Sequence, residues 1–217
     1  NSINVARFLP QMLYYFKAFF DVDKDLRSSI CFVVPSGNFG NVTAGLIAQM
    51  MGLPVRRLIP ITNANDTYFK YLSTGKYQAV PSKQTLSNAM DVGDPSNFAR
   101  IQYLLNQDWN KINEILPSMS VSDKDTLSTI EQLYKEAGYV LDPHAAVGYY
   151  GYQNLKQEGE LAIILGTASP KKFASVIQQV IPTYESPSVK ALSTHKISIP
   201  NDYIVLLDYL STIMVSK

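Results

Sequence analysis

Residues 30–49 of the chain read ICFVVPSGNFGNVTAGLIAQ, and this stretch decides the fold. The five apolar residues at positions 30–34 have the length and composition of a buried strand. Small residues from position 41 onward favour a helix, and a turn with two glycines lies between strand and helix. A strand, a glycine turn and a helix in this order are typical of a parallel α/β sheet.

The turn between this strand and this helix has the features of an anion site. Gly37 and Gly40 allow a ligand to approach the backbone closely, and the first amides of a helix have no partner inside that helix. Together with the helix dipole, these amides can hold a phosphate group. Ser36, Asn38 and Asn41 can add side-chain donors. The alternative is a tight turn whose glycines serve only helix–sheet packing, because the spacing matches neither the dinucleotide fingerprint nor the P-loop.

Composition limits the class of protein. The chain has 217 residues, of which 46% are hydrophobic and 17% charged, as expected for a globular domain rather than a disordered one. A net charge of +1 gives no electrostatic reason to expect nucleic acid or an anionic membrane as a partner. Cys31 is the single cysteine, which excludes an internal disulfide and favours a cytoplasmic setting. The two histidines and this cysteine lie too far apart for zinc-ligand spacing.

Hydrophobic periodicity and breaker residues predict the remaining elements. A helix is expected over residues 4–20, in which Pro10 marks a kink or a late start. The helix over 41–51 leads to a second strand over 55–61, which completes a βαβ unit. Further helices are predicted over 66–72, 98–106, 109–116, 123–137, from 142 onward, 171–180 and 201–214, and further strands over 77–80 and 161–165. This alternation predicts the α/β class, with an open, mainly parallel twisted sheet flanked by helices.

A second candidate site follows the strand over residues 161–165. There the hydroxyls of Thr167 and Ser169 stand at the carboxyl end of the strand, on the same side of a parallel sheet as the first turn. A hydroxyl at that place can form a hydrogen bond with a neutral heteroaromatic nitrogen without protonating it. The alternative is a Ser-Pro entry into the next helix.

Two further polar groups allow more than one interpretation. Asp142 and His144 are either a carboxylate–imidazole pair or an N-cap and a first-turn residue. Asn1, Ser2 and Arg7 gather near one helix start, where they suit an oxyanion or a phosphate; the alternative is a solvated arginine on an exposed helix face.

Six blocks of the sequence together resemble the threonine synthase family. They are NSIN at 1–4, SGNFGN at 36–41, TNAND at 62–66, LSNAMD at 86–91, DPHAAVG at 142–148 and TASPKKF at 167–173. The resemblance covers residues 1 to about 173 and implies a fold-type II enzyme that uses pyridoxal 5′-phosphate (PLP). Such enzymes convert O-phospho-L-homoserine and water to L-threonine and phosphate.

The resemblance also implies roles for individual residues. It assigns the cofactor phosphate to the first turn and the pyridine nitrogen to Thr167; the turn residues are Ser36, Gly37, Asn38, Phe39, Gly40 and Asn41. Asn1, Ser2 and Arg7 match the family pattern Asn-Ser-x-Asn-x-x-Arg, which is implied to bind the phosphate of the substrate. The family usually has histidine where this chain has Ser169, so no role is carried over to that side chain.

One family element has no counterpart in this sequence. The Schiff-base lysine of the family lies in a Phe-Lys-Asp block upstream of the Asn-Ser-Ile-Asn segment, and this chain has no such block. Lys171 and Lys172 begin a helix beyond Thr167 and are poorly placed to replace it. We therefore expect residues 1–217 to be the C-terminal portion of a threonine synthase, inactive alone, with no catalytic residue of its own.

The missing N-terminal half would then be the natural partner, and the surface that it leaves exposed would invite association, self-association included. One alternative is a non-catalytic phospholigand-binding domain that completes or regulates a partner chain. Another is a nucleotide-binding domain of the NAD type. That domain predicts an acidic residue after the second strand, where Thr62 and Asn63 stand instead.

Overall fold

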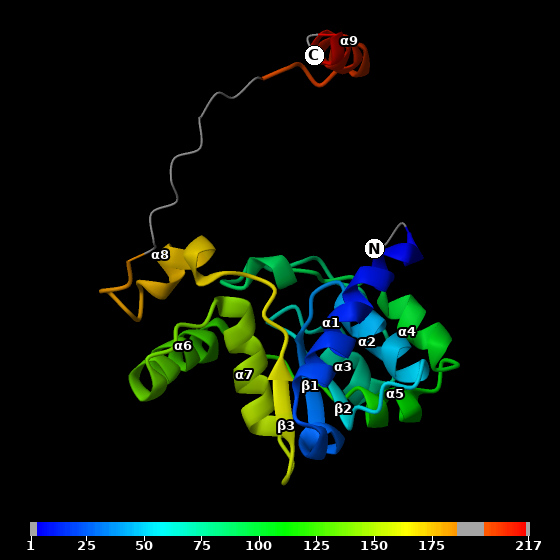
Figure 1. Cartoon of the computed structure of the whole chain (residues 1–217), viewed down its shortest axis with the longest axis vertical. Coiled ribbons are helices and arrows are strands. Elements are labelled where there is room, and N and C mark those ends of the chain that lie inside the picture. Colours follow the sequence, from blue (N-terminus) through cyan, green and yellow to red (C-terminus); the bar gives the residue numbers. More distant parts are fainter. Residues whose placement is uncertain (1–3, 186–197, 216–217) are drawn as a thin grey trace. The chain divides into compact units, whose positions relative to one another are not determined.

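The computed structural model describes residues 4–185 and 198–215 (Figure 1). The chain divides into two units, Asn1–Ser186 and Pro187–Lys217. The second unit contains helix α9 (Tyr203–Val215). Asp202 begins this helix as predicted, because its Oδ1 accepts hydrogen bonds from the amides of Ile204 (2.8 Å) and Val205 (3.2 Å).

Three parallel strands form the sheet of the first unit, in the order β2-β1-β3. They are β1 (Ile30–Pro35), β2 (Arg57–Ile61) and β3 (Leu161–Ile164). Cys31 of β1 lies opposite Arg57 on one side and opposite Ala162 on the other. The predicted open parallel sheet is confirmed. Because all strands run the same way, their carboxyl ends lie at one edge of the sheet.

The central strand β1 supplies both hydrophobic cores. Ile30, Phe32 and Val34 pack in one cluster with residues of α1 (Phe8–Asp21) and α2 (Gly40–Met50). Cys31 and Val33 point to the other face, where they pack with Val147 of α7 (Pro143–Leu155). Figure 1 shows α7 on one side of the sheet and α2 on the other. Helices on both faces explain why β1 is an uninterrupted apolar run.

The other helices follow the predicted order. They are α3 (Thr67–Thr74), α4 (Phe98–Leu104), α5 (Trp109–Ile115) and α6 (Asp123–Ala137). Short 3₁₀ turns η1 (Val5–Arg7), η2 (Lys24–Ser29) and η3 (Asn88–Met90) complete the first unit up to α7. Because η1 precedes α1, Pro10 falls in the first turn of α1, which confirms the late start rather than a kink.

Two predicted elements are wrong. Residues 77–80 form no strand: the Val80 amide donates to the Gly93 carbonyl at 3.2 Å, but a single bond makes no ladder, and the Tyr77 ring stacks on Phe98, with 5.0 Å between ring centroids. The helix expected over 171–180 is a 3₁₀ turn, η4 (Pro170–Phe173), and one short turn, α8 (Ala174–Ile177). The Lys172 amide donates to the Ser169 carbonyl at 3.0 Å, a three-residue bond that begins the segment as a tighter helix.

Candidate functional site

The first predicted turn, residues 36–41, joins β1 to α2 and is built into the core. The Ser36 amide donates to the carbonyl of Ile61 (2.8 Å), and its hydroxyl donates to the carbonyl of Val34 (2.7 Å). Both donors of Ser36 therefore hold the framework of the turn. Phe39, the N-cap residue of α2, has φ 59° and is only 2% exposed. Burial against Tyr68, at 4.7 Å between ring centroids, holds this bulky residue in a left-handed conformation that it rarely adopts.

Asn38 connects the turn to the segment before α4. Its Oδ1 accepts hydrogen bonds from the amide (2.7 Å) and hydroxyl (2.9 Å) of Ser96, and its carbonyl accepts one from Asn97 Nδ2 (2.9 Å). The side-chain oxygen of Asn38 is therefore engaged within the protein.

Gly37 lies directly against η3. A Cβ added at Gly37 would come within 2.8 Å of Met90 Cα and 3.2 Å of the Ala89 carbonyl oxygen. The close approach that requires glycine here is therefore between two segments of the chain, as in the packing alternative. The position of the turn depends on the position of η3.

The first turn of α2 offers amides to a ligand. Thr43 is the first residue of α2 whose amide donates to a carbonyl of the helix turn, at Phe39 O (3.0 Å). The amides of Gly40, Asn41 and Val42 precede it and point out of the N-terminal end, where the helix dipole is positive. This is the arrangement that can hold a phosphate.

Tyr15 of α1 fixes the Asn41 side chain. Its hydroxyl lies 2.8 Å from the Asn41 carbonyl oxygen and 3.0 Å from Asn41 Oδ1, and it donates to this pair of acceptors. Complete burial raises the pKa of Tyr15 well above its ordinary value, so the hydroxyl keeps its proton. With Oδ1 held by Tyr15, the amide nitrogen of Asn41 is the group left to act as a donor.

The second predicted turn follows β3 and opens onto the same place. The Leu165 amide donates to the Val33 carbonyl at 3.0 Å, so β3 stays paired with β1 up to the turn. A pocket of about 380 Å³ is lined by Tyr14, Asn41, Ile164, Leu165, Gly166 and Thr167. The structure thus brings the start of α2 and the Thr167 hydroxyl to one pocket at the carboxyl edge of the sheet. Thr167 is exposed and makes no hydrogen bond to any residue that the structure describes.

The third predicted group is outside this pocket. Arg7 is exposed at the end of η1, a turn that begins at Asn4, whose Oδ1 accepts a hydrogen bond from the Ala6 amide (2.9 Å). Asn1 and Ser2 lie outside the described residues.

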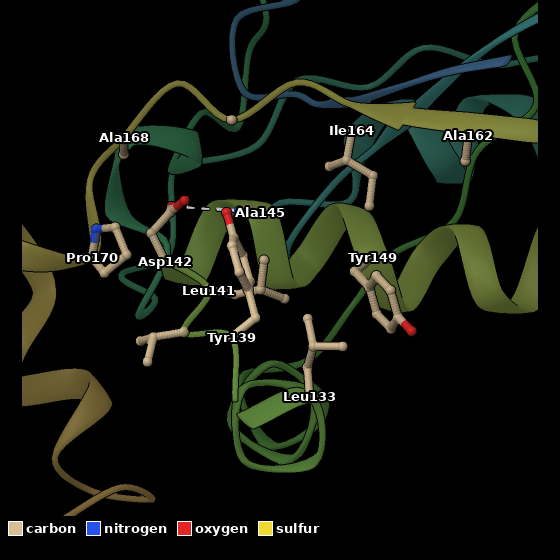
Figure 2. Close-up of a pocket in the computed structure, with 12 residues that line it drawn as sticks. Leu133, Tyr139, Leu141, Asp142, Ala145, Tyr149, Ala162, Ile164, Ala168 and Pro170 are labelled. Atoms are coloured by element: carbon tan, nitrogen blue, oxygen red, sulfur yellow. Dashed lines mark hydrogen bonds between the residues drawn. The ribbon is translucent and has the colours of Figure 1, made fainter. Parts of the chain in front are cut away.

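A second pocket, of about 440 Å³, lies beside Asp142 and Tyr149 between α6, α7 and the turn after β3 (Figure 2). Asp142 is the N-cap of α7, because its Oδ1 accepts from the amides of His144 (2.9 Å) and Ala145 (3.4 Å). The same oxygen lies 2.9 Å from His144 Nδ1. The two interpretations of Asp142 and His144 are therefore both correct.

A buried polar network next to η3 was not predicted as a functional group. Asp91 is its centre: Oδ1 accepts from Asn63 Nδ2 (2.9 Å) and Asn65 Nδ2 (3.1 Å), and Oδ2 accepts from the Thr85 amide (2.9 Å). Asn63 directly follows Thr62 at the end of β2, so the polar run after that strand was the available signal.

Within the described ranges, no group of three or more His, Cys, Asp or Glu side chains could hold a metal ion. No helix in these ranges has both the length and the apolar character needed to cross a membrane.

Comparison with known proteins identifies the family. The model of the pyridoxal-phosphate-dependent enzyme family matches residues 11–163. The threonine synthase of Serratia marcescens is 43% identical over 193 residues, which are 89% of this chain and 44% of that protein. The threonine synthase of Escherichia coli is 41% identical over 181 residues, 83% of this chain and 42% of that protein.

Solved structures agree with the sequence comparison. The crystal structure of Escherichia coli threonine synthase superimposes with a TM-score of 0.81 at 36% identity, over 98% of this chain and 50% of that one. The PLP-bound threonine synthase of Brucella melitensis gives a TM-score of 0.79 at 32% identity, over 88% of this chain and 46% of that one. The chain thus spans half, or somewhat less, of the length of these relatives. These comparisons confirm the resemblance drawn from the six sequence blocks, and the chain belongs to the family of pyridoxal-phosphate-dependent enzymes.

Proposed function

We propose that this chain forms the cofactor-binding part of a threonine synthase, which converts O-phospho-L-homoserine and water to L-threonine and phosphate. One observation carries the proposal: the first turn of α2 and the Thr167 hydroxyl meet at a single pocket, at the carboxyl ends of β1 and β3. Similarity to threonine synthases over most of the chain supports the choice of reaction.

The start of α2 would hold the phosphate of PLP. The outward amides of Gly40 and Asn41 and the positive end of the helix dipole match an anion, and Asn41 Nδ2 adds a donor oriented by Tyr15. Asn38, Gly37 and Phe39 shape this turn through their contacts with the rest of the chain rather than through side chains directed at the ligand.

Thr167 would bind the pyridine nitrogen. Its hydroxyl is exposed at the pocket and has no partner among the described residues, so it can donate to a ring nitrogen without giving up its proton. PLP, when bound, supplies an electron sink for the carbon atoms of the substrate. A hydroxyl partner leaves the ring nitrogen neutral, which moderates that sink.

Arg7, together with Asn1 and Ser2, would bind the phosphate of the substrate. A guanidinium group recognises phosphate with two parallel hydrogen bonds, and the exposed Arg7 is accessible for this contact. We assign the proton transfers to a lysine in a Phe-Lys-Asp block from the rest of the enzyme, which would be the partner of this chain in the cytoplasm.

Complementation tests this proposal. The full 217-residue chain is mixed with an N-terminal half of Escherichia coli threonine synthase that carries the Phe-Lys-Asp block, together with PLP and O-phospho-L-homoserine. We expect phosphate and threonine to appear in equal amounts from the mixture and from neither chain alone. The Thr167→Ala variant, measured in parallel, should complement poorly although the Thr167 side chain makes no hydrogen bond to any described residue.

Two results would contradict the proposal. PLP binding without any turnover in the mixture would favour a non-catalytic phospholigand-binding domain. Borohydride reduction of the chain alone with PLP, followed by intact mass, should give no specific pyridoxyl adduct; an adduct at Lys171 or Lys172 would show that this chain contains its own anchor.

A further inference from the structure

Three segments distant in sequence meet at the N-terminal end of α7. They are η3, the first turn of α7 that contains His144, and η4, which follows Thr167. His144 is only 3% exposed and contacts both other segments. The proposed function assigns no role to these contacts of His144.

The hydrogen bonds of His144 fix its tautomer. Its Nδ1 lies 2.9 Å from Asp142 Oδ1, a carboxylate oxygen that can only accept, so Nδ1 carries the proton. Its Nε2 lies 3.2 Å from the Ala89 amide, which can only donate, so Nε2 is the acceptor. The bond with Asp142 therefore orients the ring so that Nε2 accepts the hydrogen bond from the backbone of η3.

The position of η3 determines the position of the turn at residues 36–41. Met90 and Ala89 are the groups that a Cβ at Gly37 would strike, at 2.8 and 3.2 Å, so η3 forms the wall behind the turn. Asp91 holds the other end of η3 through Asn63 and Thr85. His144 is therefore the link that ties this wall to the helix α7.

His144 also contacts the segment after the second turn. Its ring meets the Phe173 ring edge-on, with 5.0 Å between centroids and 66° between planes. Phe173 ends η4, which starts three residues after Thr167. The His144 side chain thus contacts η3, which packs against the turn after β1, and η4, which follows the turn after β3.

We infer that Asp142 and His144 are positioning residues for the cofactor site. Asp142 holds His144 in the tautomer that binds the Ala89 amide. This bond keeps η3 in contact with Gly37 and so fixes the turn at residues 36–41. The inference rests on the proposed function, because it concerns the same pocket. Neither Asp142 nor His144 lines the pocket that would hold the cofactor.

A matched pair of variants separates positioning from packing. In His144→Gln the side chain is long enough to place an acceptor oxygen at the site of Nε2, so it can still bind Ala89. In His144→Asn the amide can still donate to Asp142 but is too short to reach Ala89. Both variants lose the imidazole ring and its contact with Phe173, so a merely structural role would make them alike.

The probe is PLP itself, titrated into the full chain and its variants by absorbance. We expect His144→Asn to bind PLP up to about tenfold more weakly, the worth of one neutral hydrogen bond, and His144→Gln to bind within about twofold of the unsubstituted chain. Nitrogen-15 spectra supply a second readout. The unsubstituted chain should show the proton on Nδ1, and the Ala89 amide should exchange with solvent faster in His144→Asn than in His144→Gln.

The outcomes are distinguishable. Equal PLP affinity and equal Ala89 exchange in the two variants, or a proton on Nε2 in the unsubstituted chain, would overturn this inference and leave the proposed function intact. An unsubstituted chain that binds no PLP would overturn both.

Discussion

The two turns at the carboxyl edge of the sheet differ in how the protein supports them. The turn after β1 is fixed on every side: Ser36 binds Ile61, Asn38 binds Ser96, and Phe39 is buried against Tyr68. The turn after β3 is open. Thr167 has no hydrogen bond among the described residues, and a Cβ at Gly166 would meet nothing within 4 Å.

The difference follows from the positions of the strands. β1 is central and its residues 30–34 are fully buried, whereas every residue of β3 is half-buried. A phosphate seat depends on fixed backbone amides, so it needs the rigid turn. A single hydroxyl that meets one ring nitrogen needs little support from its own turn. One side of this pocket is therefore preformed and the other is exposed.

The largest expected effect is at Phe39. Phe39→Ala removes a buried ring from the rigid turn and should lower the free energy of unfolding by about 3–5 kcal/mol. Thr167→Ala in the open turn should change it by less than about 0.5 kcal/mol. Urea unfolding of both variants followed by circular dichroism measures the contrast, and similar losses would show that the two turns are equally supported.

The two glycines give the next contrast. Gly37→Ala places a methyl group against the backbone of Met90 and should cost about 1–3 kcal/mol in unfolding free energy, with loss of PLP binding. Gly166→Ala meets open space and serves as the control, with stability close to that of the unsubstituted chain. A Gly37→Ala chain of normal stability would mean that η3 can move away from the turn.

Alkaline pH should report the burial of β1. Burial raises the pKa of the Cys31 thiol from 9.0 to about 12. Above pH 9 the unfolded chain loses a proton that the folded chain keeps, so this group should lower stability by up to about 1.4 kcal/mol per pH unit until pH 12.

Cys31→Ala provides the matching measurement. Unfolding free energies between pH 9 and 10 should fall less steeply in this variant than in the unsubstituted chain. Measuring between pH 9 and 10 limits the contribution of the buried tyrosines Tyr15 and Tyr68. Their raised pKa values also lower the free energy of unfolding, but mainly at higher pH. Equal slopes would show that the thiol of β1 is accessible.

The smallest effect concerns the link between α1 and the rigid turn. Tyr15→Phe removes the hydroxyl that binds Asn41 and should cost about 1 kcal/mol in stability, with weaker PLP binding. Tyr14→Phe is the control: Tyr14 is 59% exposed and lines the pocket from the same helix. Unchanged PLP affinity in Tyr15→Phe would remove Asn41 Nδ2 from the proposed set of donors.

The parts of the fold set by local sequence were predictable. The apolar run 30–34, the two glycines and the small residues after them predict β1, its turn and α2, because strand burial and helix entry are properties of neighbouring residues. The meeting of Asn41 and Thr167 also followed, since parallel strands end at one edge. The predicted strand over residues 77–80 was wrong because a segment becomes a strand only when a ladder of hydrogen bonds joins it to another strand.

The supports of the site were not predictable. The bond between Ala89 and His144 joins residues 55 positions apart, and it connects a backbone amide to a side chain. No periodicity encodes such a contact. The reason for glycine at position 37 was not predictable either, because it is the close approach of the Met90 backbone rather than of a ligand. From the sequence, the turn could be identified as a candidate seat, but what holds it in place could not.

The edge position of β3 also affects the handling of the chain in solution. Within the described residues, β3 pairs only with β1, so the backbone donors and acceptors of its outer side are a template for another strand. β2, at the opposite edge, contains Pro60, which lacks an amide proton and weakens such pairing. Ordered aggregation at high concentration should therefore begin at β3. A lysine placed on its outer edge would be the first substitution to improve solubility.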